Sequence, residues 1–396
     1  MAFVVQPFGL SGLKDLSNKK RSKNKRGSIM IHKEQLDIII DSRRNSEDFS
    51  PLNVKTGLEV TQIKPPDWLI DDFIMEGGFT VLHSDAGVGK TFLALDWANT
   101  IANGWQWFSK ESVKVPVLYV LAEGVGFLGA RVTAWKNKRN ATSYPPVHYY
   151  TSAVPLFAPV GKFPMRDQID FLELVDRIKP GLIVFDTLQR CTVGANENLQ
   201  QDMSQVIAMI DTIRQNYNTA ILAVHHDTKS GEAMRGSSVL KASADTTIQL
   251  TKKDEIIEMT CTKQKDAEAF KDWNLTLSTE PKSGSAFFTA YQQGVKVRDY
   301  SLLRALADVI TIRGEQITNK TWRDSANLDG GRFERPKASL VREGLVDQLG
   351  EGRSKTYTIS KEGWDLLEQQ NMLNTTSFRP LPDNIKPEQQ ELLEDE

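Results

Sequence analysis

The segment from Phe79 to Thr91, FTVLHSDAGVGKT, constrains the fold more than any other part of the chain. A short apolar run leads into a glycine-rich turn ending in Gly89-Lys90-Thr91, and an amphipathic stretch from Phe92 to Ala102 follows. This order of strand, turn and helix is the layout of a cradle for nucleotide phosphates. The sequence therefore predicts an α/β domain that binds a nucleoside triphosphate.

Each residue type in the turn suits a polyphosphate. Glycines let consecutive backbone N–H groups face the anion, a lysine reaches the β and γ phosphates, and a hydroxyl binds Mg²⁺. Ser84 stands where the usual pattern has its first glycine, and a small residue still fits a tight turn. The predicted nucleotide contacts are Ser84, Asp85, Ala86, Gly87, Val88, Gly89, Lys90, Thr91 and Phe92.

Composition predicts a soluble, cytoplasmic protein of two or three domains. The chain has 396 residues, of which 40% are apolar, and none of its apolar runs is long enough to span a bilayer. Its opening, MAFVVQPFGL, lacks the basic flank of a signal peptide. Cys191 and Cys261 are isolated, so they form neither a metal spacing nor a disulfide framework.

The net charge of −2 gives no global basic excess that would indicate nucleic acid. Charge is nevertheless uneven, because Lys14 to Arg26 is strongly basic and the last ten residues are acidic. Both ends have the composition of solvated, disordered tails. The alternative is a basic arm that touches phosphates and an acidic tail that recruits a basic replication partner.

Beyond the phosphate loop, strand-like runs alternate with helical patterns. This alternation predicts a mostly parallel sheet covered by helices on both faces. The predicted strands are FTVLH, VPVLYVLAE, VHYY, LIVFD and TAILAVHH, and the helices are about Phe127 to Lys138, Arg166 to Ile178 and Asp202 to Gln215. After Ala244 the runs DTTIQL, IIEMTCT, WNLTLS and AFFTAY alternate in polarity, which predicts antiparallel strands at one sheet edge.

Two carboxylates follow predicted strands. Asp186 ends LIVFD, where an ATPase holds Mg²⁺ through water, and Glu123 ends VPVLYVLAE, where a base or water-positioning group is needed. The next residues, Gly124 to Gly129, match GxGxxG, a dinucleotide pattern. That alternative is disfavoured, because no acidic residue for a ribose lies between Tyr144 and Pro164.

An ordered set of motifs from Pro65 to Tyr291 resembles the RecA-fold ATPases of the RepA hexameric helicase type, which are related to the DnaB-type replicative helicases. The motifs are the phosphate loop, LYVLAEGVGFLGARVTAW, LIVFDTLQR, AVHHDTKSGEAMRGSSVL and CTKQK. The resemblance implies ATP and Mg²⁺ as cofactors and a homo-oligomeric, hexameric ring on single-stranded DNA.

The resemblance also assigns roles to individual residues. It implies phosphate and Mg²⁺ contacts for Lys90 and Thr91, the catalytic base for Glu123, the Mg²⁺-holding acid for Asp186, and a γ-phosphate sensor for His225 or His226. Metal binding by the two histidines beside Asp227 is disfavoured, because neither helical spacing nor a cysteine partner is present.

The resemblance also implies roles for three lysines and one arginine. Lys229 and Arg235, in the polar loop from His226 to Ser237, would contact DNA in a central channel, unless this loop is only a surface connection. Lys263 and Lys265 would reach the γ phosphate of the neighbouring subunit, although lysine lacks the bidentate fork of the more usual arginine. The alternative for them is a solvated strand edge.

The carboxyl-terminal segment resembles a winged helix. Three helices precede a hairpin whose tip, Gly350 to Lys355, carries the candidate nucleic-acid contacts Arg353 and Lys355. Such modules also serve as protein-docking domains.

The predicted domains are residues 1–62, a basic arm and linker with a short helix at Ile29 to Ile40; 63–296, a RecA-like ATPase; 297–372, the winged helix; and 373–396, the acidic tail.

These observations lead to the expectation of an ATP-driven, ring-forming motor on single-stranded DNA, a helicase in the replication of phage, plasmid or other mobile DNA. Two alternatives stay open. One is a RecA-like repair or recombination ATPase that does not unwind DNA, and the other is a DNA-binding regulator whose oligomeric state is switched by the nucleotide.

Overall fold

The computed structural model describes residues 55–157, 166–227, 238–291, 296–314 and 316–375. The chain divides into two compact units, Met1–Pro65 and Pro66–Glu396. In the first, helix α2 (Gly57–Thr61) begins with a capping box, in which Thr56 and Glu59 satisfy each other's backbone N–H groups. The predicted helix at Ile29 to Ile40, the basic arm and the acidic tail lie outside the described residues.

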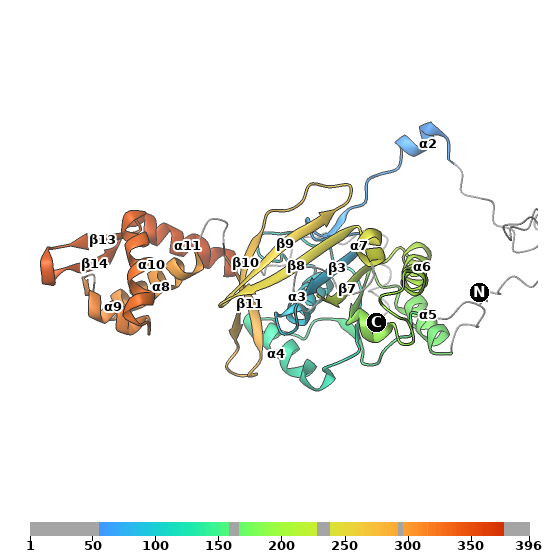
Figure 1. Cartoon of the computed structure of the whole chain (residues 1–396), viewed down its shortest axis with the longest axis horizontal. Helices are drawn as coiled ribbons and strands as arrows, with labels where there is room; N and C mark the ends of the chain where they lie inside the picture. The colour runs from blue at the N-terminus through green and yellow to red at the C-terminus, as the bar shows by residue number, and fades with distance from the viewer. Residues whose placement is uncertain (1–54, 158–165, 228–237, 292–295, 315, 376–396) are drawn as a thin grey trace, which may run out of the picture. The chain divides into compact units, whose positions relative to one another are not determined.

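The second unit is built on a nine-stranded sheet with the order β11-β10-β9-β8-β3-β7-β6-β4-β5. Figure 1 labels β3 and β7 to β11 of this sheet. Six neighbouring strands are parallel: β3 (Phe79–Ser84), β4 (Val117–Leu121), β5 (Val147–Tyr150), β6 (Leu182–Asp186), β7 (Ala220–His226) and β8 (Thr246–Lys253). Three antiparallel strands extend one edge: β9 (Ile256–Gln264), β10 (Trp273–Thr279) and β11 (Ala286–Tyr291). The predicted α/β class, with a mostly parallel RecA-like core, is confirmed.

Helices cover both faces of this sheet because its strands are apolar on both sides. In β4, Tyr119 packs in the cluster that contains helix α3 (Lys90–Asn103), while Val120 packs in the cluster that contains α5 (Arg166–Ile178) and α6 (Gln200–Tyr217). A short hairpin of β1 (Trp68–Ile70) and β2 (Ile74–Met75), absent from the sequence prediction, adds to the α3 side.

Strand register brings the ends of the parallel strands to one edge. Ser84 of β3 pairs with His226 of β7, and Asp186 of β6 pairs with Leu121 of β4. The segments that follow β3, β4, β6 and β7 therefore meet at the carboxyl ends of the strands. We call this side of the sheet the carboxyl edge. The opposite edge, where β3 begins at Phe79, is called the amino edge.

The carboxyl-terminal elements have a separate hydrophobic cluster around Trp322, Phe333, Leu340 and Tyr357. The elements are α8 (Val297–Arg313), β12 (Ile317–Thr318), α9 (Asn319–Ser325), α10 (Gly330–Arg342), β13 (Val346–Leu349), η5 (Gly352–Ser354), β14 (Thr356–Ile359) and α11 (Lys361–Thr375). The strands pair in the order β12-β14-β13, so the expected hairpin between Val346 and Ile359 is present. Its assignment as a winged helix stays a prediction.

Within the described residues, no helix combines the length and the apolar content that crossing a membrane requires.

Candidate functional site

The phosphate loop connects β3 to α3 at the carboxyl edge. Helix α3 begins at Lys90, two residues earlier than the sequence predicts, because Gly89 caps it with a left-handed φ of 118°. A Cβ at Gly89 would lie 3.0 Å from Leu277 Cδ1 and 3.2 Å from Phe288 Cζ. The backbone conformation therefore favours glycine here, and a larger residue would also displace the Leu277 and Phe288 side chains slightly.

Lys90 lies buried beneath this loop. Its Nζ donates to the carbonyl oxygens of Ser84 at 2.9 Å and Asp85 at 2.8 Å, and to Ser84 Oγ at 2.9 Å. Serine at the first glycine position thus supplies an acceptor for the lysine. Burial lowers the pKa of the Lys90 ammonium, while the negative charges of Asp227 and Asp186 oppose that shift. Oxygen atoms at the end of β3 and the start of the loop therefore hold the ammonium beneath the loop that would bind the β and γ phosphates.

Asp186, at the end of β6, receives two hydroxyl donors. Thr91 Oγ1 donates to its Oδ1 at 3.2 Å, and the Tyr119 hydroxyl donates to its Oδ2 at 2.7 Å. Burial raises the pKa of the Asp186 carboxyl, and these hydrogen bonds oppose the increase. A hydroxyl and a carboxylate side by side are hard oxygen ligands, which Mg²⁺ prefers. The predicted metal residues Thr91 and Asp186 therefore lie together and fit Mg²⁺.

Glu123 lies just beyond β4 at the same edge. Its Oε2 is 3.0 Å from Nε of Arg190, which belongs to the 3-10 turn η4 (Leu188–Cys191), and both side chains are exposed enough to contact solvent. The negative charge of Glu123 raises the pKa values of both Lys90 and Asp186. The sequence prediction missed Arg190, because its pairing with Glu123 depends on β6 lying next to β4.

The segment Gly124 to Gly129 does not open directly into a long helix. It forms a 3-10 turn, η3 (Val125–Phe127), before α4 (Leu128–Lys138), and Phe127 is 69% exposed. Arg131 of α4 lies with its guanidinium 5.1 Å from the centre of the Phe92 ring. Its positive charge lowers the pKa values of Asp186 and Tyr119 against the larger effect of burial. Arg131 was not singled out from the sequence.

The two histidines at the end of β7 occupy different surroundings. His226 Nδ1 lies 3.2 Å from Lys90 Nζ, whereas His225 is buried opposite His83 of β3. Of the two histidines that the resemblance implies as γ-phosphate sensors, His226 is the one that lies beside Lys90 of the phosphate loop. Asp227 pairs with His83 Nδ1 at 2.6 Å. In the described part of the chain, no cluster of three or more histidine, cysteine or acidic residues could hold a metal ion.

Lys263 and Lys265 lie at the amino edge, remote from the phosphate loop of their own chain. Lys263 of β9 pairs with Thr247 of β8, which pairs with Val81 of β3. The backbone N–H of Lys265 donates to the carbonyl of Asp245 at 2.8 Å, level with Phe79. From Phe79 to Ser84, β3 rises about 16 Å.

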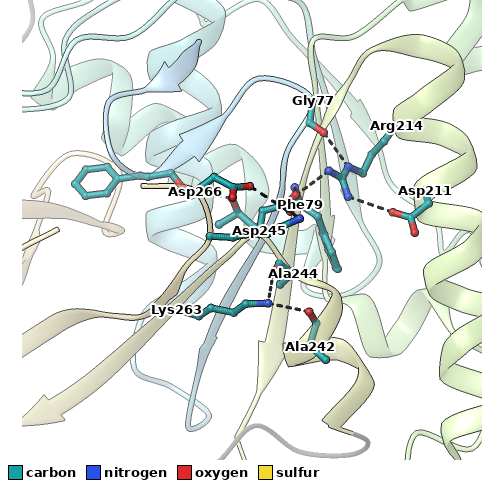
Figure 2. Close-up of polar contacts among 12 residues, drawn as sticks. Gly77, Phe79, Asp211, Arg214, Ala242, Ala244, Asp245, Lys263 and Asp266 are labelled. Atoms are coloured by element: carbon teal, nitrogen blue, oxygen red, sulfur yellow. Dashed lines mark hydrogen bonds and ion pairs between the residues drawn. The ribbon is translucent and has the colours of Figure 1, made fainter. Parts of the chain in front are cut away.

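The two lysines differ in how they are held, and Figure 2 shows the contacts of Lys263 with Ala242 and Ala244. Lys263 Nζ donates to the carbonyl oxygens of Lys241, Ala242 and Ala244 at 3.1, 2.8 and 2.5 Å, at the end of α7 (Ser238–Ser243). Lys265 is exposed, and its Nζ lies 3.9 Å from the nearest carboxylate oxygen of Asp245. Lys263 therefore caps a helix of its own chain, while Lys265 is the more accessible cation.

Two of the four candidate nucleic-acid residues lie in segments that the structure describes. Lys229 and Arg235 lie outside the described residues. Lys355 is half-buried at the end of η5, next to Arg353 in the tip of the hairpin.

One of three comparisons with known proteins, a match to a family model, covers the residues at the carboxyl edge. Residues 45–232 match a family model described as an AAA domain. A solved structure of a KaiC-like protein from the hyperthermophilic archaeon Pyrococcus horikoshii is 14% identical, with a TM-score of 0.37, covering 57% of this chain and 94% of that chain. The search of curated proteins gave no match. The family match and the phosphate loop together identify a P-loop ATPase domain, the kind of domain that binds ATP with Mg²⁺.

Proposed function

We propose that this protein is an ATP-driven, ring-forming motor that acts on single-stranded DNA, a DNA helicase of the kind used to replicate mobile DNA. One observation carries the proposal. Lys90, Thr91, Asp186 and Glu123 converge at the carboxyl edge, while the lysines implied as γ-phosphate contacts lie at the amino edge. A phosphate site that uses both edges needs two copies of the chain.

The chemistry at the carboxyl edge is that of metal-assisted phosphoryl transfer to water. Lys90 would bind the β and γ phosphates, and Thr91 and Asp186 would hold Mg²⁺, which neutralises charge on the phosphate oxygens. Glu123 would orient the attacking water and accept its proton. Arg190, paired with Glu123 at 3.0 Å, would keep that carboxylate at the edge of the site.

The carboxyl-terminal elements would serve as a nucleic-acid tether. The order of α8, β12, α9, α10 and the β13–β14 hairpin supports a winged-helix assignment, with Arg353 and Lys355 at the hairpin tip for phosphate contacts. Removing both charges, Arg353→Ala with Lys355→Ala, should reduce the slope of log affinity against log salt by about two. Lys252→Ala with Lys253→Ala, which removes two exposed charges at the end of β8, is the matched control.

The decisive experiment measures assembly of the full chain with a non-hydrolysable ATP analogue, Mg²⁺ and a single-stranded oligonucleotide. Native mass spectrometry should give a closed oligomer, with six copies expected, and electron microscopy should show a ring. A monomer under all of these conditions would refute the ring.

Two further assays separate the alternative functions. ATP hydrolysis should rise when single-stranded DNA is added, and the protein should displace a strand from a forked duplex. DNA-stimulated hydrolysis without strand displacement would favour the repair or recombination ATPase. Slow hydrolysis that DNA does not change would favour the nucleotide-switched regulator.

A further inference from the structure

A buried tyrosine holds the carboxylate that is predicted to bind Mg²⁺. Tyr119 lies in the middle of β4 with no exposed surface, and its register partner in β6 is Val184. Its hydroxyl reaches two residues further along β6 and donates to Asp186 Oδ2 at 2.7 Å. A carboxylate oxygen accepts hydrogen bonds, so the phenol hydroxyl of Tyr119 is the donor in this contact.

The two oxygen atoms of Asp186 have different donors. Oδ1 accepts from Thr91, the hydroxyl that opens α3, while Oδ2 accepts from Tyr119 on the adjacent strand. The terminal torsion of an aspartate is broad, so one donor would leave the carboxylate free to rotate. With Tyr119 on Oδ2, the other oxygen is directed toward Thr91.

The position of Tyr119 is itself fixed. It packs in the core cluster on the α3 face, and its ring centre is 6.0 Å from that of Tyr149 on β5. The Tyr149 hydroxyl donates to Asn99 Oδ1 at 3.0 Å. Two neighbouring tyrosines of the same cluster therefore share a hydrophobic role, and only one of them contacts the metal-binding carboxylate.

We propose that Tyr119 is a positioning residue for Mg²⁺: it fixes Asp186 in the orientation in which Oδ1, beside the Thr91 hydroxyl, is available to the hydrated metal ion. The inference rests on the proposed ATPase function and does not depend on DNA binding or on ring formation. A residue that orients a metal ligand affects metal affinity by about tenfold to a hundredfold.

The test compares Tyr119→Phe with Tyr149→Phe in the full chain. Each substitution removes one hydroxyl and leaves the ring in the core. The first measurement is binding of a fluorescent ADP analogue, with EDTA and then over a MgCl₂ titration. In EDTA both variants should bind the analogue within about twofold of the unsubstituted chain. The Mg²⁺ concentration at half-saturation should rise about tenfold or more for Tyr119→Phe and stay unchanged for Tyr149→Phe.

A second measurement distinguishes positioning from a structural role. ATP hydrolysis by Tyr119→Phe should recover to within about threefold of the unsubstituted chain at saturating Mg²⁺, because excess metal compensates for a weakened site. Weakened binding in EDTA, hydrolysis that excess Mg²⁺ does not restore, or the same Mg²⁺ response for both variants would overturn the proposal. If Mg²⁺ changes neither nucleotide binding nor hydrolysis in the unsubstituted chain, the proposed function fails as well.

Discussion

The two edges of the central sheet use charged residues in opposite ways. At the carboxyl edge, Lys90, Glu123 and Asp186 come from three separate segments. The negative charges of Asp186 and Glu123 raise the pKa of the Lys90 ammonium. At the amino edge, Arg214 of α6 donates to the carbonyl of Gly77 and to the carboxylates of Asp211 and Asp245 (Figure 2). The first edge gathers groups for chemistry, and the second joins chain segments together.

Asp245 shows the structural character of the amino edge. Its Oδ2 accepts from Arg214 NH2 at 2.7 Å and from the backbone N–H of Phe79 at 2.9 Å, so it ties α6 to the start of β3. Lys265 is the exception at this edge, because its side chain is 59% exposed. Asp245 therefore has a structural role at this edge, whereas the side chain of Lys265 is accessible.

The largest expected effect is at the carboxyl edge. Lys90→Ala removes the only positive charge of the phosphate loop, Ser84 to Thr91, that would bind the β and γ phosphates, so ATP hydrolysis should fall by about a thousandfold or more. Steady-state phosphate release measures the loss, and an unchanged thermal unfolding midpoint serves as the control for folding. Activity within tenfold of the unsubstituted chain would remove Lys90 from the site.

The next effect separates hydrolysis from binding. Glu123→Gln keeps an oxygen acceptor for Arg190 but cannot accept a proton, so hydrolysis should fall by about a hundredfold. Binding of a fluorescent ATP analogue should stay within a few-fold of the unsubstituted chain. Normal hydrolysis by this variant would end the assignment of Glu123 as the base.

A smaller effect tests whether the amino edge serves a neighbour. Lys265→Ala should lower hydrolysis by about tenfold to a hundredfold, and mixing it with Lys90→Ala protein should restore part of the activity, because some interfaces then hold both intact residues. Lys263→Ala is the comparison, since its ammonium already binds the end of α7. No recovery despite demonstrated subunit exchange would argue against a shared site for Lys265.

The smallest effect concerns stability alone. Asp245→Asn removes the charge that pairs with Arg214, so the free energy of unfolding should fall by about 1–3 kcal/mol. Hydrolysis well below the unfolding temperature should not change. Asp308→Asn, which breaks an exposed pair with Arg304, is the control and should cost less than about 1 kcal/mol in urea unfolding. Equal effects of the two substitutions would mean that the Asp245 cluster has no special structural role.

Local sequence determined the features whose physical cause is local. The phosphate loop was predictable because strand, glycine turn and Gly-Lys-Thr are contiguous, and α5 has the predicted bounds, Arg166–Ile178, because its apolar positions repeat with the helical period. The bounds of helix α9, one of the three helices expected before the hairpin, could not be predicted, because Trp322 is its only buried residue.

Tertiary structure alone decided which side chains meet. The contacts of Tyr119 with Asp186, of Arg190 with Glu123 and of Lys263 with the end of α7 join residues 67, 67 and 21 positions apart in the chain. The sequence indicated that Asp186 and Glu123 end strands, since apolar runs with terminal carboxylates are visible locally. Which strands are neighbours, and how they are paired in register, depends on packing both faces of the sheet at once, and this information is spread over the whole chain.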